Sequence, residues 1–311
     1  MKKSRTNGKM IFCVCVMVTV LLLTGCGSVK TDDKEAPANQ TVTATENPGY
    51  HAKPNAADGY VHSHPAGTTV CYDLDGDGIG EDITVNAHEY EAGNLVIGNA
   101  SVEFWSATPT GYFTVLNPNT ARDILLVGIS DYGFSDDNMT VLYAYDGKNI
   151  KEIGYFDDIT GENAYGYAGA VFRGDGTVSA TTRLDILGTW NASCRYYVDE
   201  TGVWDITEFY QYKDWDGNQG GWEVTAKVPL IMCDEIGNFD IQTVIPAGTQ
   251  LQMNGIRKAN EAGSYWVSFT VVSTGKTFWM VAEEVDWQTY VQSGDGLFAS
   301  EEAFDGFFYA G

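Results

Sequence analysis

Positive charge is scarce in this sequence. Lysine and arginine together number 18 against 42 aspartates and glutamates, which gives a formal net charge of −24. A chain without a basic patch cannot meet the phosphates of nucleic acid, so we exclude DNA and RNA as partners. Divalent cations and neutral or basic partners stay open. The alternative is that the acidic surface only keeps the protein in solution.

Catalytic signatures are also missing. The chain has four histidines, and it contains no G-x-S-x-G, H-E-x-x-H or cysteine–histidine motif. An enzyme built on this sequence would have to use paired carboxylates, and Asp131, Asp136 and Asp137 in "SDYGFSDDN" are the candidates. These acids lie in turns beside Gly, Ser and Asn, where solvation explains them. We therefore predict a non-catalytic protein, with a glycosidase-like extracellular hydrolase as the alternative.

Cysteine gives no zinc site. Of the six cysteines, Cys71, Cys194 and Cys233 lie beyond the N-terminal region, and their spacing fits no zinc motif. They are free thiols, or Cys71 and Cys194 form one disulfide. His62 and His64 have no third ligand nearby in the sequence, so they are either a metal pair or, as we predict, part of an exposed tether.

One apolar run dominates the N-terminus. "MKKSRTNGK" is basic, residues 10–23 are apolar, and "LTGC" follows at Leu23–Cys26. A basic segment followed by a short apolar one is typical of a secretory signal, which we assign to residues 1–25. An uncleaved membrane-spanning helix is the alternative, although the run is short for a bilayer that needs about 20 residues.

The segment "LTGC" resembles the processing site of bacterial lipoproteins. The resemblance implies that Cys26 becomes the first residue of the mature protein and carries a lipid. We therefore predict a protein anchored to the membrane through Cys26, on the extracellular face of the bacterial cell membrane.

Amphipathic helical runs of normal length are absent between Thr68 and Tyr212, where short β-branched and aromatic runs alternate with turns. This pattern predicts an all-β protein. "YDGKN" and "RGDGT" carry the Asp-Gly pair of tight hairpins. We predict a disordered tether over 26–66, a β-repeat domain over 67–212, a linker over 213–221, and a small β domain with an aromatic tail over 222–311.

The β-repeat region carries a weak internal period. "DLDGDGIGEDITV" has a faded copy in "LNPNTARDILLV", and a third unit begins near residue 169. Repeats of about 45 residues made of four strands are typical of propeller blades. Three units are too few for a regular propeller, so we predict a degenerate, propeller-like arrangement. In the copy, Asn117, Asn119 and Asp123 keep one charge, and we expect its metal binding to be lost.

The densest charge lies in "DLDGDGIGED", residues 73–82. Acids at alternate positions of a curled loop turn toward one centre, and Gly78 permits the sharp turn. Position twelve is Thr84 rather than glutamate, so the loop is not a helical EF-hand. We predict a Ca²⁺ site, with a bare acidic turn or another cation as alternatives. The predicted ligands are Asp73, Asp75, Asp77, the backbone carbonyl of Ile79, and Glu81.

The loop resembles the calcium loops of FG-GAP/VCBS repeats, in which Asp-x-Asp-x-Asp-Gly-x-x-acid precedes an apolar strand. The wider layout resembles Firmicutes surface lipoproteins with such repeats and a C-terminal bacterial SH3-like domain. "LTGC", "DILGTW", "VPLIM" and "TVIPAGTQLQM" carry that resemblance. It implies propeller-like β repeats followed by a small SH3-like β-barrel, and it assigns no biochemical role.

These features favour a cell-surface binding module that calcium stabilises and that engages cell-wall glycan or a surface protein. Tryptophan rings can stack on sugar faces, although core packing is the alternative for each of them. We expect Trp215 and Trp222 to be the most exposed, and the tail residues 304–309 to pack back onto the body. The remaining candidate rings are Trp105, Trp190, Trp204, Trp266 and Trp279.

Overall fold

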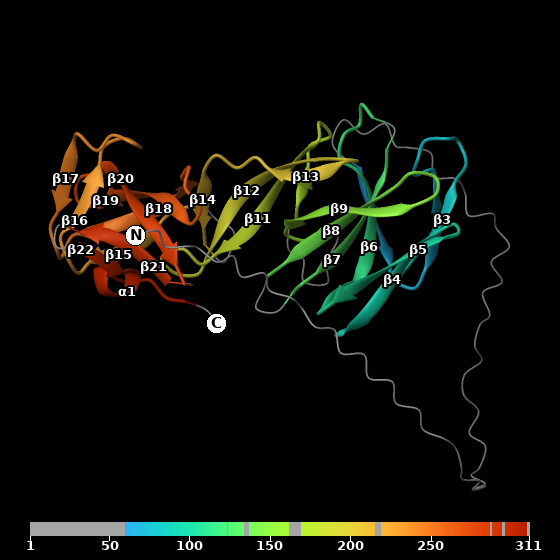
Figure 1. Cartoon of the computed structure of the whole chain (residues 1–311), viewed down its shortest axis with the longest axis horizontal. Helices are drawn as coiled ribbons and strands as arrows, with labels where there is room; N and C mark the ends of the chain where they lie inside the picture. Colours follow the sequence, from blue (N-terminus) through green and yellow to red (C-terminus); the bar gives the residue numbers. More distant parts are fainter. Residues whose placement is uncertain are drawn as a thin grey trace, which may run out of the picture. The chain divides into compact units, whose positions relative to one another are not determined.

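The computed structural model describes residues 60–122, 124–133, 137–161, 169–214, 219–286, 288–293 and 296–309. The chain divides into two units, Met1–Thr45 and Glu46–Gly311, and all described residues belong to the second. Their regular structure is antiparallel β, with one short helix, α1 (Ser300–Ala303). The all-β prediction is confirmed (Figure 1). Among the described residues, no sheet closes into a barrel.

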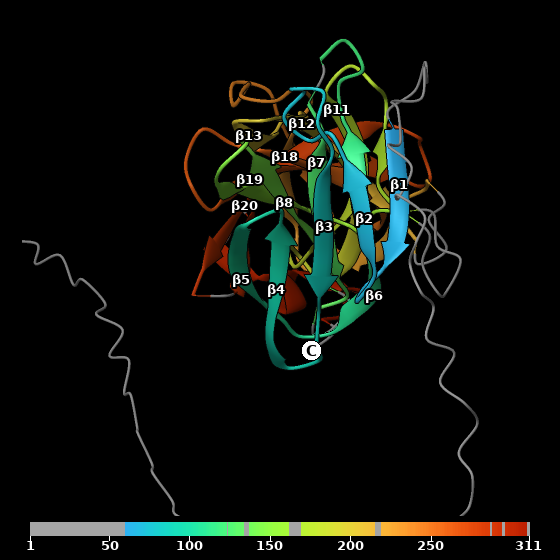
Figure 2. The same cartoon turned by 90° about the vertical axis from the view of Figure 1, so that its right-hand side faces the viewer.

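Two smaller sheets make up the N-terminal part of the described chain. The four-stranded sheet runs in sequence order (Figure 2): β2 (Thr69–Tyr72), β3 (Glu81–Asn86), β4 (Glu91–Ile97) and β5 (Ala100–Ser106). The five-stranded sheet has the order β1 (Tyr60–Pro65), β6 (Pro109–Asn117), β7 (Leu126–Asp131), β8 (Met139–Tyr145) and β9 (Ile150–Asp157).

The third sheet holds the other fourteen strands. Its first part contains β10 (Val171–Phe172), β11 (Thr177–Leu184), β12 (Trp190–Asp199), β13 (Gly202–Asp205) and β14 (Tyr210–Lys213). The remainder contains β15 (Trp222–Ala226), β16 (Leu230–Cys233), β17 (Gln242–Ile245), β18 (Gln250–Lys258), β19 (Ser264–Val271), β20 (Thr277–Val285), β21 (Gln288–Ser293), β22 (Gly296–Ala299) and β23 (Phe304–Asp305).

The strands follow from alternation in the sequence. In β12 the side chains at every second position are buried, from Trp190 through Cys194 to Val198, as a strand with one face on a core requires. By contrast, β7 is buried along five consecutive residues. Leu126 packs into one core and Val127 into the other, so the five-stranded sheet is covered on both faces.

Two hydrophobic cores hold these layers. The smaller core lies between the four- and five-stranded sheets and includes Leu74, Ile83, Phe113 and Val127. The larger core extends from Leu116 to Phe304 and joins the opposite face of the five-stranded sheet to the fourteen-stranded one.

The predicted tether ends too late. Residues 60–65 are strand β1, in which His62 lies opposite Val115 and His64 opposite Phe113 of β6. Pairing with β6 gives this polar segment a partner that its own sequence does not reveal. His64 is consequently buried, at 8% exposure, which overturns its assignment to an exposed tether. Residues 26–59 of the predicted tether lie outside the described residues.

The other predicted boundaries stay predictions. Strand β14 lies at the end of the predicted repeat domain, and it pairs with β18 beyond the predicted linker through Tyr210 and Ile256.

Cys71, Cys194 and Cys233 are free thiols, so there is no disulfide between Cys71 and Cys194. Among the described residues, no helix has the length and apolar character needed to cross a membrane.

Candidate functional site

The acidic loop joins β2 to β3, whose ends pair through Tyr72 and Glu81. Leu74 within the loop is 1% exposed and packs into the smaller core. Gly76 and Gly78 have φ angles of +80° and +90°, a backbone conformation that residues with a Cβ adopt only at a cost. Burial of Leu74, together with the two left-handed glycines, therefore turns the acidic side chains of the loop outward.

Hydrogen bonds within the loop fix its carboxylates. The two oxygens of Asp73 accept the N–H groups of Gly76 and Gly78, at 2.8 and 3.0 Å. Oδ1 of Asp75 accepts the N–H of Asp77 at 3.1 Å. These bonds hold each acid in place without neutralising its charge.

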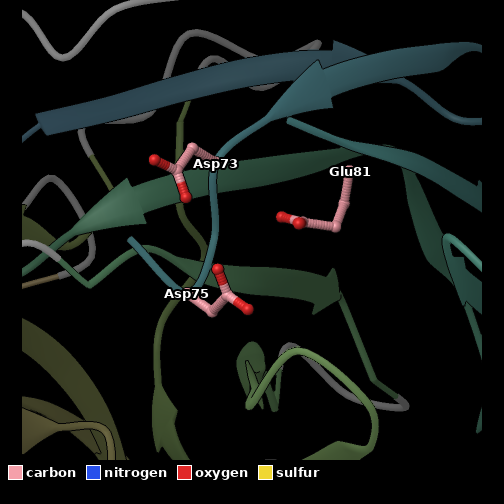
Figure 3. Close-up of side chains that lie close together, drawn as sticks. All are labelled: Asp73, Asp75 and Glu81. Atoms are coloured by element: carbon pink, nitrogen blue, oxygen red, sulfur yellow. The ribbon is translucent and has the colours of Figure 1, made fainter. Parts of the chain in front are cut away.

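Three carboxylates converge in this loop. Asp73, Asp75 and Glu81 each place one oxygen within 4.8 Å of the others, and Figure 3 shows them around a common space. Glu81 is further held by the N–H of Leu74, which donates to its Oε2 at 2.9 Å. Three of the predicted ligand residues are thus brought together.

The other predicted ligands lie apart from this group. Oδ1 of Asp77 accepts the N–H of Ile79 at 2.7 Å, and Asp77 is not among the three converging acids. The side chain of Ile79 is 68% exposed. Cys26, the predicted lipid-bearing residue, lies outside the described residues.

Electrostatics at the site favour a cation. Burial raises the pKa of Glu81, and the negative charges of Asp75 and Asp73 raise it further, against the hydrogen bond from Leu74. The donor set contains oxygen only, which suits a hard cation such as Ca²⁺. A divalent ion would relieve the repulsion between these acids, so the residues present fit it.

A neighbouring hairpin lies against the loop. A Cβ built on Gly147, in the turn between β8 and β9, would lie 2.5 Å from Oδ2 of Asp75. Beside this contact is an open cavity of about 450 Å³, lined among others by Asp77, Asp146 and Lys151. The sequence indicated "YDGKN" as a hairpin but gave no sign that it adjoins the acidic loop.

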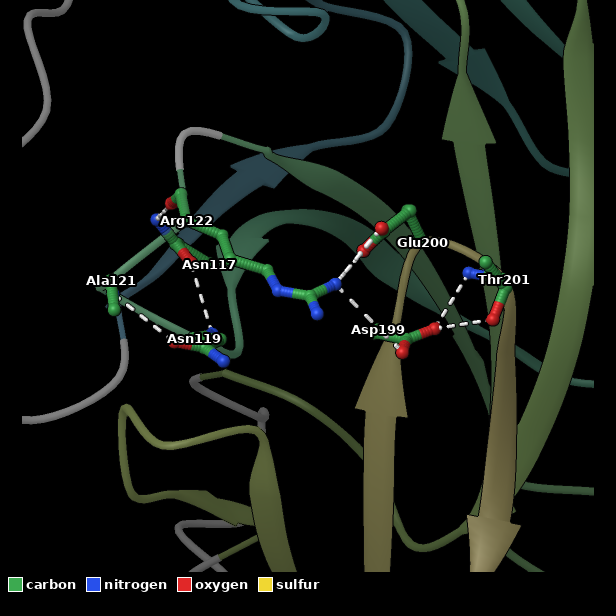
Figure 4. Close-up of polar contacts among 7 residues, drawn as sticks. All are labelled: Asn117, Asn119, Ala121, Arg122, Asp199, Glu200 and Thr201. Atoms are coloured by element: carbon green, nitrogen blue, oxygen red, sulfur yellow. Dashed lines mark hydrogen bonds and ion pairs between the residues drawn. The ribbon is translucent and has the colours of Figure 1, made fainter.

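The faded copy of the loop is held by protein groups (Figure 4). The amide oxygens of Asn117 and Asn119 accept the N–H groups of Asn119 and Ala121, at 3.0 and 3.1 Å. The guanidinium of Arg122 bonds both carboxylate oxygens of Glu200, at 2.9 and 2.7 Å. The faded copy thus contains a positively charged side chain paired with a carboxylate, whereas the first loop brings carboxylates together. Asp123 lies outside the described residues.

The acids considered for hydrolysis have structural partners. The carboxylate of Asp131 accepts the N–H groups of Ala107, Thr108 and Gly133. Asp137 forms an ion pair with Arg183 at 3.7 Å. Asp136 lies outside the described residues.

The aromatic candidates divide by exposure. Trp105 is 61% and Trp204 is 44% exposed, whereas Trp190 is buried. Trp222 packs against Phe307 and Phe308 with ring centroids 5.1 and 5.0 Å apart, so the expectation that it is the most exposed ring is wrong. Trp215 lies outside the described residues.

The aromatic tail packs back only in part. Phe304 is buried, while Phe308 and Tyr309 are 50% and 47% exposed.

Comparisons with protein-family models, with curated proteins and with solved structures found no match. The function of this chain therefore has to be inferred from the geometry of the loop and its surroundings.

Proposed function

We propose that this protein is a membrane-anchored extracellular lipoprotein that acts as a non-catalytic binding module for cell-wall glycan or a surface protein, stabilised by calcium. The observation that carries the proposal is the convergence of Asp73, Asp75 and Glu81 beside the β8–β9 hairpin. An ion held there would stabilise a loop of one sheet against a hairpin of the next.

Calcium is the preferred ion because of the donors. Ca²⁺ takes six to eight oxygen ligands in flexible geometry. Three carboxylates supply part of this shell, and Asp77, the Ile79 carbonyl and water are candidates for the rest. Imidazole and thiolate, which softer metals prefer, are absent from this group of residues.

Binding is favoured over catalysis by the exposed rings. Trp204 lies over Gly202, where an added Cβ would be 2.9 Å from its indole, and its centroid is 5.9 Å from that of Tyr197. One side of this ring is thus supported while 44% of the residue stays exposed. A supported and exposed aromatic ring can stack on a sugar face. The hydrolase alternative would gain support from glycan cleavage by the purified protein.

We interpret residues 67–212 as degenerate FG-GAP/VCBS-type repeats and residues 222–311 as an SH3-like module, as the sequence resemblance implies. Lipid attachment at Cys26 would anchor both at the cell surface, and loss of lipid labelling in Cys26→Ala checks that part.

Calcium titration of the chelator-stripped protein tests the proposal. A ligand at 100 times its Kd stabilises the folded state by about 2.7 kcal/mol, so calcium should raise the Tm of the wild type. Asp75→Asn keeps an oxygen for the N–H of Asp77 but removes the charge, and should abolish most of the shift. Asp82→Asn changes an exposed neighbouring acid and should preserve it. Equal shifts in both variants would refute the assignment.

Binding is measured separately, by sedimentation with purified cell wall. Retention should fall when chelator is added and in Asp75→Asn, while Asp82→Asn should behave as the wild type. If chelator does not change the retention, calcium has no role in binding to the cell wall.

A further inference from the structure

We propose a second metal site, formed by His62, His64 and Tyr72, that binds a transition-metal ion, Cu²⁺ in preference to others. It is separate in chemistry from the acidic loop. His62 and His64 come from β1 of the five-stranded sheet, and Tyr72 comes from β2 of the four-stranded sheet.

The three donor atoms already meet. Oη of Tyr72 lies 2.8 Å from Nε2 of His64 and 2.8 Å from Nδ1 of His62. The two imidazole centroids are 4.5 Å apart. Residues two apart on a strand face the same side, so β1 presents both rings together to the phenol.

These distances suit adjacent positions on one metal ion. Bonds from a metal to imidazole nitrogen are about 2.0–2.1 Å long. Two donor atoms 2.8 Å apart, each at such a distance, subtend roughly 85–90° at the ion, from the same bond lengths. Right angles between nitrogen and oxygen donors are the geometry of tetragonal Cu²⁺ or Ni²⁺. Copper binds most tightly in the usual order of divalent ions, which decides between the two.

The surroundings hold the donors in position. Tyr72 is 1% exposed and His64 is 8% exposed, and the His64 ring lies 5.4 Å from that of Phe113. His62 is exposed and provides the approach from solvent. Burial therefore confines two of the three donors before an ion arrives, which lowers the entropy cost of ordering them around it.

The proton balance is simple. With one hydroxyl proton for two hydrogen bonds, Tyr72 donates to one imidazole nitrogen and accepts from the N–H of the other. When copper binds, that second imidazole carries its proton on the opposite ring nitrogen instead, so that Nδ1 of His62 and Nε2 of His64 both offer lone pairs. Copper displaces the hydroxyl proton of Tyr72 to form a copper–phenolate bond, so one proton is released per ion. Neither copper nor the protein changes oxidation state.

Titration of the full chain with Cu²⁺, followed by electron paramagnetic resonance and visible absorption, tests the site. The wild type should show hyperfine coupling to two imidazole nitrogens and a phenolate-to-copper absorption band. His62→Ala should weaken copper binding at least tenfold, and the variant should still fold because His62 is exposed. Tyr72→Phe should keep nitrogen coupling but lose the band.

Matched controls isolate the site. The double variant H51A/H88A leaves only the two site histidines and should bind copper as the wild type does. Asp75→Asn should also bind copper normally, which separates this test from that of the calcium site. Copper binding that is unchanged in His62→Ala, or that shows no nitrogen coupling, overturns the proposal.

Discussion

Asp158 shows how surroundings set the chemistry of a single residue. It follows β9 with a φ of +100°, and its two oxygens accept the N–H groups of Ile159 and Thr181, at 2.8 and 2.9 Å. Burial raises its pKa to about 6, in spite of these hydrogen bonds and of the charge of Lys213. Because both oxygens bond to backbone groups, the carboxylate ties the end of β9 to β11, and we assign it a structural role.

The raised pKa of Asp158 predicts how stability changes with pH. The folded state holds its proton more tightly than the unfolded chain, so this residue's contribution is fully present below about pH 4 and is lost as the pH rises through 6. The difference is on the order of 3 kcal/mol, at 1.36 kcal/mol per pKa unit. Urea unfolding between pH 4 and 8 measures it. In Asp158→Asn the free energy of unfolding should change less between pH 4 and 6 than in the wild type. The control Asp240→Asn, at an exposed residue, should keep the wild-type pH dependence. The same pH dependence in both variants would contradict the prediction.

Elements that lie far apart in the chain meet at the acidic loop. The loop between β2 and β3 adjoins the turn between β8 and β9, where Gly147 has a φ of +83° and leaves room for Asp75. The faded copy of the loop adjoins the turn after β12 instead, where Arg122 pairs with Glu200 at 2.7 Å. Each loop thus contacts a turn, one through carboxylates that suit a cation and one through an ion pair.

Replacing Gly147 tests the contact between elements. Gly147→Ala places a methyl group 2.5 Å from Oδ2 of Asp75, so the carboxylate must move and the calcium-induced rise in Tm should shrink. Gly275→Ala is the control, because Gly275 has a φ of +70° but no atom within 4 Å of an added Cβ. Both variants place a residue with a Cβ at a positive φ, which lowers the stability of the folded state by about 1–2 kcal/mol in each. If the calcium response is the same in both, the hairpin does not support the site.

At the scale of the whole molecule, the larger hydrophobic core crosses the predicted linker. Tyr212 packs against Trp190 and Trp222, with ring centroids 5.9 and 6.1 Å apart. Tyr210 in β14 is buried and lies opposite Ile256 in β18. Strand β14 therefore pairs with a strand of the predicted C-terminal domain, although it precedes the start of that domain at residue 222.

Fragments test this arrangement. We predict that fragment 222–311 folds, because most of its strands pair with one another, and that fragment 208–311 is more stable because β14 covers the β18 edge. Burial of one tyrosine is worth roughly 2 kcal/mol. Circular dichroism melts of both fragments provide the measurement. A disordered fragment 222–311 would show that the boundary at residue 222 is misplaced. Equal melting temperatures of the two fragments would show that β14 does not stabilise the C-terminal strands.

Much of the fold could be read from local patterns. Alternating burial in β12 and the Asp-Gly turns are properties of neighbouring residues, so the sequence predicts all-β structure without knowledge of what packs where. The glycines and alternating acids of the loop are a local pattern of the same kind, and from them the sequence predicts a cation site. In both cases the deciding interactions span a few residues.

Only the tertiary structure decided which side chains meet. His62 and His64 look like tether residues until β6 pairs with their strand and Tyr72 reaches them from another sheet. Within the loop, the sequence alone determined the excess of carboxylates, but packing of Leu74 and pairing of Glu81 with Tyr72 selected three of them. Periodicity is encoded locally, whereas convergence depends on sheets that associate over long separations, and no local pattern records that association.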